Sequence, residues 1–135
     1  MDFGKAIEIA QNELVEYNKK LKVLRDYYLA SVEKNIPFIR INGDLENRLA
    51  GNANICFKGV DGGKLLQELD QVGICASSGS ACSAGLLNPS HVLLAIGVPT
   101  NVARSSLRVT FGRENTIEDV DYLVENLSRI VKKLR

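Results

Sequence analysis

The first quarter of the chain carries one continuous apolar stripe at helical spacing, and this stripe limits the folds open to the sequence. Between residues 4 and 34, apolar side chains recur at steps of three and four: Ile7, Ala10, Leu14, Tyr17, Leu21, Leu24 and Tyr28. The spacing predicts one long helix with a narrow apolar face. A narrow stripe needs a covering surface, so we expect either the rest of the chain or another protein to cover it.

The remaining residues predict short strands that alternate with helices. The predicted strands span 38–41, 53–57, 72–75 and 107–111; the predicted helices span 64–69, 89–96 and 116–134, with a helical turn near Val102. Pro37 ends the first helix, residues 42–44 form a structural turn, and Thr116 is a suitable N-cap. This order predicts an α+β fold, a small and mainly antiparallel sheet packed with helices, in a single domain of residues 1–135.

Composition argues against several classes of protein. Charged residues make up 24% of the 135 and the formal net charge is +1, so neither a disordered chain nor a basic nucleic-acid-binding surface is indicated. No apolar run reaches the ~20 residues that a membrane-spanning helix needs. The first ten residues do not resemble a secretory signal. We therefore expect a cytoplasmic protein with no nucleic-acid or membrane partner.

The cysteines and the single histidine do not favour a disulfide framework or a metal site. Cys56, Cys75 and Cys82 are an odd number of thiols, no Cys-x-x-Cys pair occurs, and His91 is the only histidine. A structural zinc site needs four ligands, so we expect no metal. Cys56 and Cys75 stand among apolar residues and are expected to be core thiols.

The chemically informative segment is Ser77-Ser78-Gly79-Ser80-Ala81-Cys82-Ser83-Ala84-Gly85, which precedes a predicted helix. Small residues favour a loop whose backbone can approach another group closely. A thiol in such a loop is accessible, as a nucleophile must be, so Cys82 is a candidate nucleophile. The alternative is that Cys82 is one more small residue in a flexible loop.

Four motifs together resemble the cysteine desulfurases of the class-V aminotransferase family, and the NifS/IscS-type enzymes most closely. They are Ser77 to Cys82, Pro89-Ser90-His91-Val92-Leu93, Ser105-Ser106-Leu107-Arg108, and Gly112-Arg113 with Asn115-Thr116, in the family's order and spacing. The resemblance covers nearly the whole chain. It implies the C-terminal small domain of a fold-type I transferase that depends on pyridoxal phosphate.

The resemblance also implies roles for individual residues. In the family, a loop cysteine attacks the sulfur of L-cysteine bound to pyridoxal phosphate and leaves a persulfide and alanine, and Cys82 matches that nucleophile. Arg108 matches the arginine that binds the substrate carboxylate, which a guanidinium grips with two parallel hydrogen bonds. The residues that would position the loop are Ser77, Ser78, Gly79 and Ser80. Simple turn chemistry is the alternative for each serine.

Much of the family's enzyme lies outside this chain. The Schiff-base lysine, the aspartate on the pyridinium nitrogen and the stacked histidine belong to the family's large domain, so we expect this chain alone to bind no pyridoxal phosphate and to be inactive. His91 does not match that histidine. The resemblance further implies a homodimer, L-cysteine as substrate, and an iron–sulfur scaffold or another sulfur acceptor as partner.

Two other functions stay open on the sequence. The chain could be a non-catalytic carrier that receives a persulfide on Cys82, or an interaction module that uses the same fold, since a fold does not fix a function. A carrier needs the thiol but not Arg108, and an interaction module needs neither. The presence of both favours the desulfurase domain.

Overall fold

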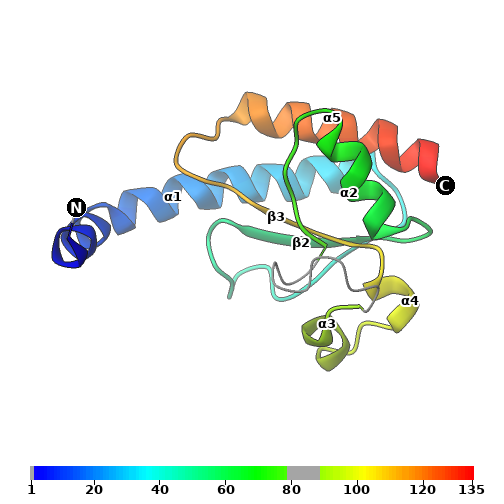
Figure 1. The fold of residues 1–135 in the computed structure, drawn as a ribbon, viewed down its shortest axis with the longest axis horizontal. Helices are drawn as coiled ribbons and strands as arrows, with labels where there is room; N and C mark the ends of the chain where they lie inside the picture. Colours follow the sequence, from blue (N-terminus) through cyan, green and yellow to red (C-terminus); the bar gives the residue numbers. More distant parts are fainter. Residues whose placement is uncertain (1, 79–88) are drawn as a thin grey trace.

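The computed structural model describes residues 2–78 and 89–135, which form five helices and three strands (Figure 1). The helices are α1 (Phe3–Asn35), α2 (Gly62–Asp70), α3 (His91–Ala95), α4 (Thr100–Ala103) and α5 (Ile117–Leu134); the strands are β1 (Ile39–Ile41), β2 (Asn52–Phe57) and β3 (Ser106–Thr110). The expected α+β fold with a small antiparallel sheet is confirmed.

The sheet has the order β1-β2-β3, and both pairs of neighbours are antiparallel. Ile55 of β2 stands opposite Leu107 of β3, and Asn54 stands opposite Arg108. Because successive side chains of a strand point to opposite faces, Ile55, Leu107 and Val109 share one face, while Asn54 and Arg108 share the other. The predicted separation of Arg108 from Leu107 and Val109 is confirmed by their burial.

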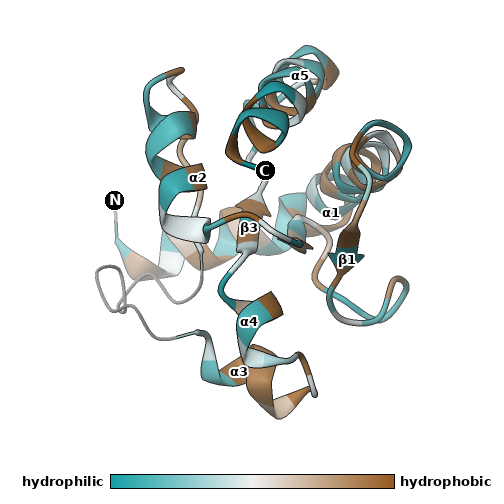
Figure 2. Ribbon diagram, turned by 90° about the vertical axis from the view of Figure 1, so that its right-hand side faces the viewer, coloured by the Kyte–Doolittle hydropathy of each residue, from teal (hydrophilic) through white to brown (hydrophobic). Residues whose placement is uncertain are grey.

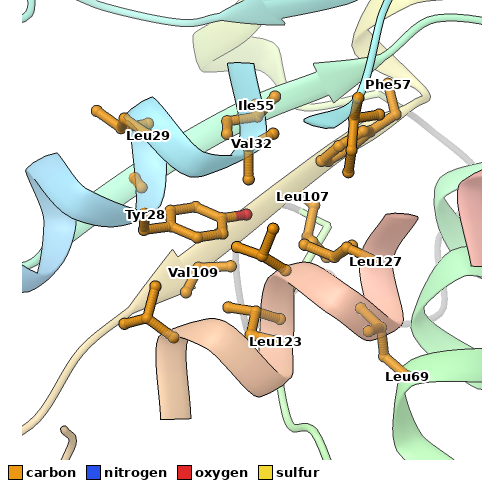
Figure 3. Close-up of a cluster of buried hydrophobic side chains, with 14 of the residues drawn as sticks. Tyr28, Leu29, Val32, Ile55, Phe57, Leu69, Leu107, Val109, Leu123 and Leu127 are labelled. Carbon is orange, nitrogen blue, oxygen red and sulfur yellow. The ribbon is translucent and has the colours of Figure 1, made fainter. Parts of the chain in front are cut away.

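The apolar face of the sheet is covered by α1, α2 and α5 (Figure 2). Side chains from these helices and from β2 and β3 meet in one cluster (Figure 3). The Tyr28 ring lies in this cluster and meets Phe111 edge to face, with 5.7 Å between ring centroids. Ile55, Leu107 and Leu127 are completely buried. Each such side chain stabilises the fold by about 1.5–3 kcal/mol relative to an exposed one.

The core covers α1 over its C-terminal half only. Leu21, Leu24 and Tyr28 are buried, whereas Ile7 and Leu14 are 43% and 54% exposed. In Figure 1 the N-terminal half of α1 extends past the sheet, and the C-terminal half runs beside α5. The long helix predicted from the stripe is confirmed, and the described residues cover the stripe only where α5 and the sheet reach it.

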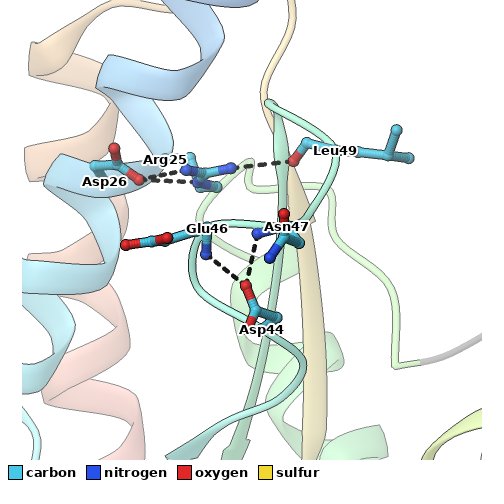
Figure 4. Close-up of polar contacts among 6 residues, drawn as sticks. All are labelled: Arg25, Asp26, Asp44, Glu46, Asn47 and Leu49. Carbon is cyan, nitrogen blue, oxygen red and sulfur yellow. Dashed lines mark hydrogen bonds and ion pairs between the residues drawn. The ribbon is translucent and has the colours of Figure 1, made fainter.

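A buried arginine connects α1 to the chain between β1 and β2 (Figure 4). Arg25 is 2% exposed, and its Nε and Nη2 atoms donate to Asp26 Oδ1 at 2.9 and 2.7 Å. Its Nη1 atom donates to the backbone oxygen of Leu49 at 3.3 Å. The bond to Leu49 ties the connection to the helix, and the bonds to Asp26 lie within α1 and pair the charge of the guanidinium.

The chain bends at Gly43, within the turn expected at residues 42–44. Asp44 Oδ1 accepts hydrogen bonds from the backbone N–H groups of Asn47 and Glu46, and these bonds lower the pKa of the Asp44 carboxyl. Gly43 has φ of 83°, a value that side chains other than hydrogen rarely allow. The turn therefore has a structural role, as the sequence indicated.

The helices α3 and α4 lie on the other face of the sheet (Figure 2). They contribute to a second, much smaller apolar cluster. Cys56 of β2 packs against Leu93 of α3, against Val98 between the two helices, and against Ala103 of α4. The cluster is distinct from the main core and holds the α3–α4 unit on the sheet.

The segment that follows α2 corrects one sequence prediction, because residues 72–75 do not form a strand. The backbone N–H groups of Val72 and Ile74 donate back to the oxygen of Leu69 at 3.1 and 3.0 Å, and Gly73 between them has φ of 75°. These bonds close the end of α2. Within the described residues the segment pairs with β3 only at Ser77. A groove of about 450 Å³ lies between residues 73–76, the end of β3 and the start of α5.

The start of α5 confirms the predicted N-cap. Thr116 Oγ1 accepts the backbone N–H of Asp119 at 3.3 Å, and Asp119 Oδ2 accepts the backbone N–H of Thr116 at 3.0 Å. This reciprocal pair satisfies two backbone donors that the helix itself leaves unpaired. It fixes the residue at which α5 begins.

Candidate functional site

Arg108 lies on β3, on the face of the sheet that the main core leaves uncovered. Its side chain is half-buried, and no described residue forms a hydrogen bond or ion pair with its guanidinium. A guanidinium is always charged and presents a planar fork of donors. This group is therefore available to an anion from outside the described residues.

The segment that carries Cys82 starts beside Arg108. The backbone N–H of Ser77 donates to the oxygen of Arg108 at 3.1 Å, and the N–H of Arg108 donates to the oxygen of Ser77 at 2.5 Å. The hydroxyl of Ser106, which is completely buried, donates to the oxygen of Ser78 at 2.7 Å. The structure thus places Ser77 and Ser78 against the strand of Arg108. The other predicted site residues, Gly79, Ser80 and Cys82, lie outside the described residues.

Two asparagines on the face of the sheet that carries Arg108 are not among the predicted site residues. Asn54 stands directly opposite Arg108 in the β2–β3 register. Asn42, only 3% exposed, donates from Nδ2 to Asn54 Oδ1 at 2.7 Å. The sequence predicts a turn at Asn42 and a strand at Asn54, and it predicts no role in the site for either residue. The signal that would have found them is the strand register, which places a polar side chain opposite the candidate arginine.

Cys56 and Cys75 have opposite surroundings. Cys56 is completely buried, and this burial raises the pKa of its thiol, against the smaller opposing effect of a hydrogen bond from Asn42 Nδ2 at 3.1 Å. A buried neutral thiol is inert, so the expected core role of Cys56 is confirmed. Cys75 is exposed, and its expected core role is wrong. The cause is the missing strand, because the segment leaves α2 without entering the sheet.

The residues after the Cys82 segment lead onto the same face of the sheet. Pro89 and Ser90 precede α3, and His91 is its first residue. His91 is exposed, while Leu93 is turned into the small cluster with Cys56. The described residues thus attach both sides of residues 79–88 to the sheet, one at β3 and one through α3.

The described residues do not fit a pyridoxal phosphate site. A lysine that holds the cofactor as a Schiff base needs an enclosing pocket that lowers its pKa and keeps water out. All nine lysines are exposed; they lie on α1, α2 and α5 and directly after β2. None of the described residues therefore supplies the lysine that the cofactor requires.

Two further properties concern metals and membranes. Within residues 2–78 and 89–135, no group of three or more His, Cys, Asp or Glu side chains is placed to hold a metal ion. Among the helices of the same residues, none combines the length and the apolar character needed to cross a bilayer.

Comparison with known proteins gives consistent matches. A family model described as aminotransferase class-V matches residues 1–123. The cysteine desulfurase IscS of Clostridium botulinum strain Hall is 46% identical over 134 residues, which cover 98% of this chain and 34% of that protein. The enzyme of the same name from Methanosarcina thermophila is 47% identical over 132 residues, covering 98% and 32%. The chain thus spans about a third of the length of these curated relatives.

A solved structure agrees with the sequence matches. The NifS-like protein from Rickettsia africae ESF-5 superposes with a TM-score of 0.83 at 28% identity, covering 96% of this chain and 33% of that one. The strand with Arg108, the anchored Ser77 and the surrounding helices therefore belong to a fold that NifS-like proteins share. Because the class-V model matches most of the chain and the relatives described above are cysteine desulfurases, this chain belongs to the class-V aminotransferase family.

Proposed function

We propose that this chain is the substrate-binding and sulfur-accepting part of a cysteine desulfurase. Arg108 binds the carboxylate of L-cysteine, and the thiolate of Cys82 forms a bond to the substrate's sulfur. The carbon–sulfur bond breaks, the persulfide stays on Cys82, and the carbon takes up a proton and leaves as L-alanine. Pyridoxal phosphate and its lysine come from protein outside these residues.

The pairing of Ser77 with Arg108 is the observation that carries the proposal. Both backbone hydrogen bonds of this pair tie the segment of Cys82 to Arg108, whose guanidinium forms no hydrogen bond or ion pair with any described residue. Cys82 follows Ser78 by four residues, a covalent tether of at most about 14 Å. A nucleophile and a carboxylate-binding group that serve one small substrate need such a shared anchor.

We further propose that the persulfide on Cys82 passes to an acceptor protein, such as a scaffold for iron–sulfur cluster assembly, and that the complete enzyme is a cytoplasmic homodimer. The support is the similarity to NifS-like and IscS proteins. A persulfide must meet its acceptor at the surface, and the described residues on both sides of the Cys82 segment are partly exposed.

Release of sulfide from L-cysteine tests the proposal. With added pyridoxal phosphate and a reductant, the chain alone is expected to give no more sulfide than its Cys82→Ala variant, because all nine lysines are exposed. A hybrid, in which this chain replaces the matching third of the Clostridium botulinum relative, is expected to release sulfide. The hybrid should lose this activity with Cys82→Ala and keep it with Cys75→Ala, a matched loss of an exposed thiol.

The hybrid also tests Arg108. Arg108→Ala is expected to raise KM for L-cysteine by more than tenfold, because hydrogen bonds to a charged group contribute about 1.5–3 kcal/mol. Sulfide release by the hybrid that survives Cys82→Ala would refute the role of Cys82. Turnover by the chain alone that depends on Cys82 would show that it holds the cofactor itself.

A further inference from the structure

Asn54 and Arg108 face each other across β2 and β3 in a way that favours contact between their side chains. They are directly paired in the antiparallel register. The N–H and C=O groups of Arg108 bond to Ser77 on the outer side of β3, so the pair with Asn54 is of the kind without mutual backbone hydrogen bonds. In such pairs the Cα atoms are about 4.5 Å apart and the side chains are closest.

The side-chain amide of Asn54 is held in one orientation by Asn42. Asn42 Nδ2 donates to Asn54 Oδ1 at 2.7 Å, and the backbone N–H of Asn42 donates to the oxygen of Asn54 at 2.9 Å. Asn42 is itself almost completely buried, at 3% exposure. Since the amide oxygen of Asn54 is engaged, its NH₂ group is the part left to interact, and no described residue accepts from it.

The surroundings of this amide favour an anion. None of the residues in β1, β2 and β3 is acidic. Arg40 stands opposite Cys56 in the β1–β2 register and adds a second positive charge to the face that carries Arg108. Two guanidinium groups and an amide donor thus share the face of the sheet opposite the main core, without a carboxylate from the strands to neutralise them.

We propose that Asn54 is a second ligand of the substrate carboxylate, in addition to Arg108. The guanidinium occupies one lone pair on each carboxylate oxygen, and each oxygen keeps a second lone pair that Asn54 Nδ2 can donate to. Arg108 then supplies the charge and Asn54 fixes the rotation of the carboxylate, with Asn42 as the residue that positions Asn54. This inference rests on the proposed function and identifies a further substrate-binding residue.

The sharpest variant is Asn54→Asp. It keeps an oxygen for Asn42 to donate to, but it replaces the NH₂ donor with a negative oxygen that repels a carboxylate and pairs with Arg108. Asn52→Asp is the matched control, because Asn52 lies on the same strand and face and is also half-buried, but stands opposite Thr110. Both variants add the same charge, and only one removes the proposed contact.

Binding is measured by titrating the ¹⁵N-labelled full chain with L-cysteine under reducing conditions, with cysteamine as a probe that lacks the carboxylate. In the wild-type chain, the side-chain signals of Asn54 Nδ2 and Arg108 Nε are expected to shift with L-cysteine and not with cysteamine. Asn54→Asp is expected to raise the Kd for L-cysteine about tenfold or more. Asn52→Asp is expected to raise it less than about threefold. The wild-type titration tests the contact even if a variant fails to fold.

The outcomes separate this inference from the proposed function. If Arg108→Ala abolishes binding while Asn54→Asp binds like the wild type, the role of Asn54 is refuted and that of Arg108 stands. If Asn52→Asp weakens binding as much as Asn54→Asp, the effect is one of charge alone and the inference fails. Binding that is unchanged by Arg108→Ala would overturn both.

Discussion

Replacing Tyr28 with phenylalanine is expected to stabilise the protein. Tyr28 is completely buried, and its hydroxyl has no hydrogen-bond partner among the described residues. A buried hydroxyl without a partner costs about 1–3 kcal/mol of desolvation. Tyr28→Phe removes that hydroxyl and keeps the edge-to-face contact with Phe111. The free energy of unfolding should therefore rise by about 1 kcal/mol, which corresponds to about 3–4 °C in Tm for a chain of this length.

The same burial has a consequence at alkaline pH. Burial raises the pKa of Tyr28 well above the ordinary value of 10.0. In the window from pH 10 up to the raised pKa, the unfolded chain loses this proton while the folded protein keeps it. The free energy of unfolding then falls by up to about 1.4 kcal/mol per pH unit from this group. The free energy of unfolding can be measured by urea unfolding at pH 8 and pH 11. The amount by which Tyr28→Phe exceeds the wild type should be larger at pH 11.

Tyr122→Phe is the matched control, with the opposite expected sign. The hydroxyl of Tyr122 donates to the backbone oxygen of Val72 at 3.0 Å, and the Tyr122 side chain is about half exposed, so loss of this bond should lower the free energy of unfolding by about 0.5 kcal/mol. A loss of 1 kcal/mol or more in Tyr28→Phe would refute the reasoning, because it would show that the Tyr28 hydroxyl has a partner in the folded protein.

Three further measurements test other parts of the structure. Gly62→Ala would place a Cβ atom 2.6 Å from the backbone oxygen of Arg104, so we expect a loss of about 2 kcal/mol or more in urea unfolding. Thr116→Ala removes the N-cap side chain of α5 and should cost about 1 kcal/mol in the same assay. In labelling with a thiol reagent followed by peptide mass analysis, Cys75 should react within the native protein and Cys56 only after unfolding; equal rates would contradict the burial of Cys56.

The regular elements of the fold could be predicted because their signals are local. The apolar stripe in α1, the cap at Thr116 and the alternation around Arg108 each depend on residues a few positions apart. The predicted boundaries differ from the observed ones by a few residues, as for α3, which spans His91–Ala95. Frayed and capped ends depend on hydrogen bonds that spacing alone does not show.

The errors arose where hydrogen bonds that residue composition does not show decide the structure. The apolar residues 72–75 have strand composition, but bonds back to Leu69 and the positive φ of Gly73 close α2 there instead. The prediction that Cys75 lies in the core is wrong for the same reason, because the segment that carries it does not enter the sheet. The neighbourhood of Asn54 and Arg108 depends on the register between two strands that are about 50 residues apart in the sequence. No local pattern encodes that register, so only the structure reveals the polar pair.

The division of the apolar residues into two clusters means that the protein can open in parts. The α3–α4 unit is held on the sheet mainly by Leu93, Val98 and Ala103 against Cys56, whereas α1, α2 and α5 share the large core. Local openings take place where few apolar contacts have to be broken. Amide protons of α3 and α4 should therefore undergo hydrogen exchange through a partial unfolding that leaves β3 intact. The α3–α4 unit would then be a separate cooperative unit, able to detach and re-dock while β3 holds Arg108 in its place.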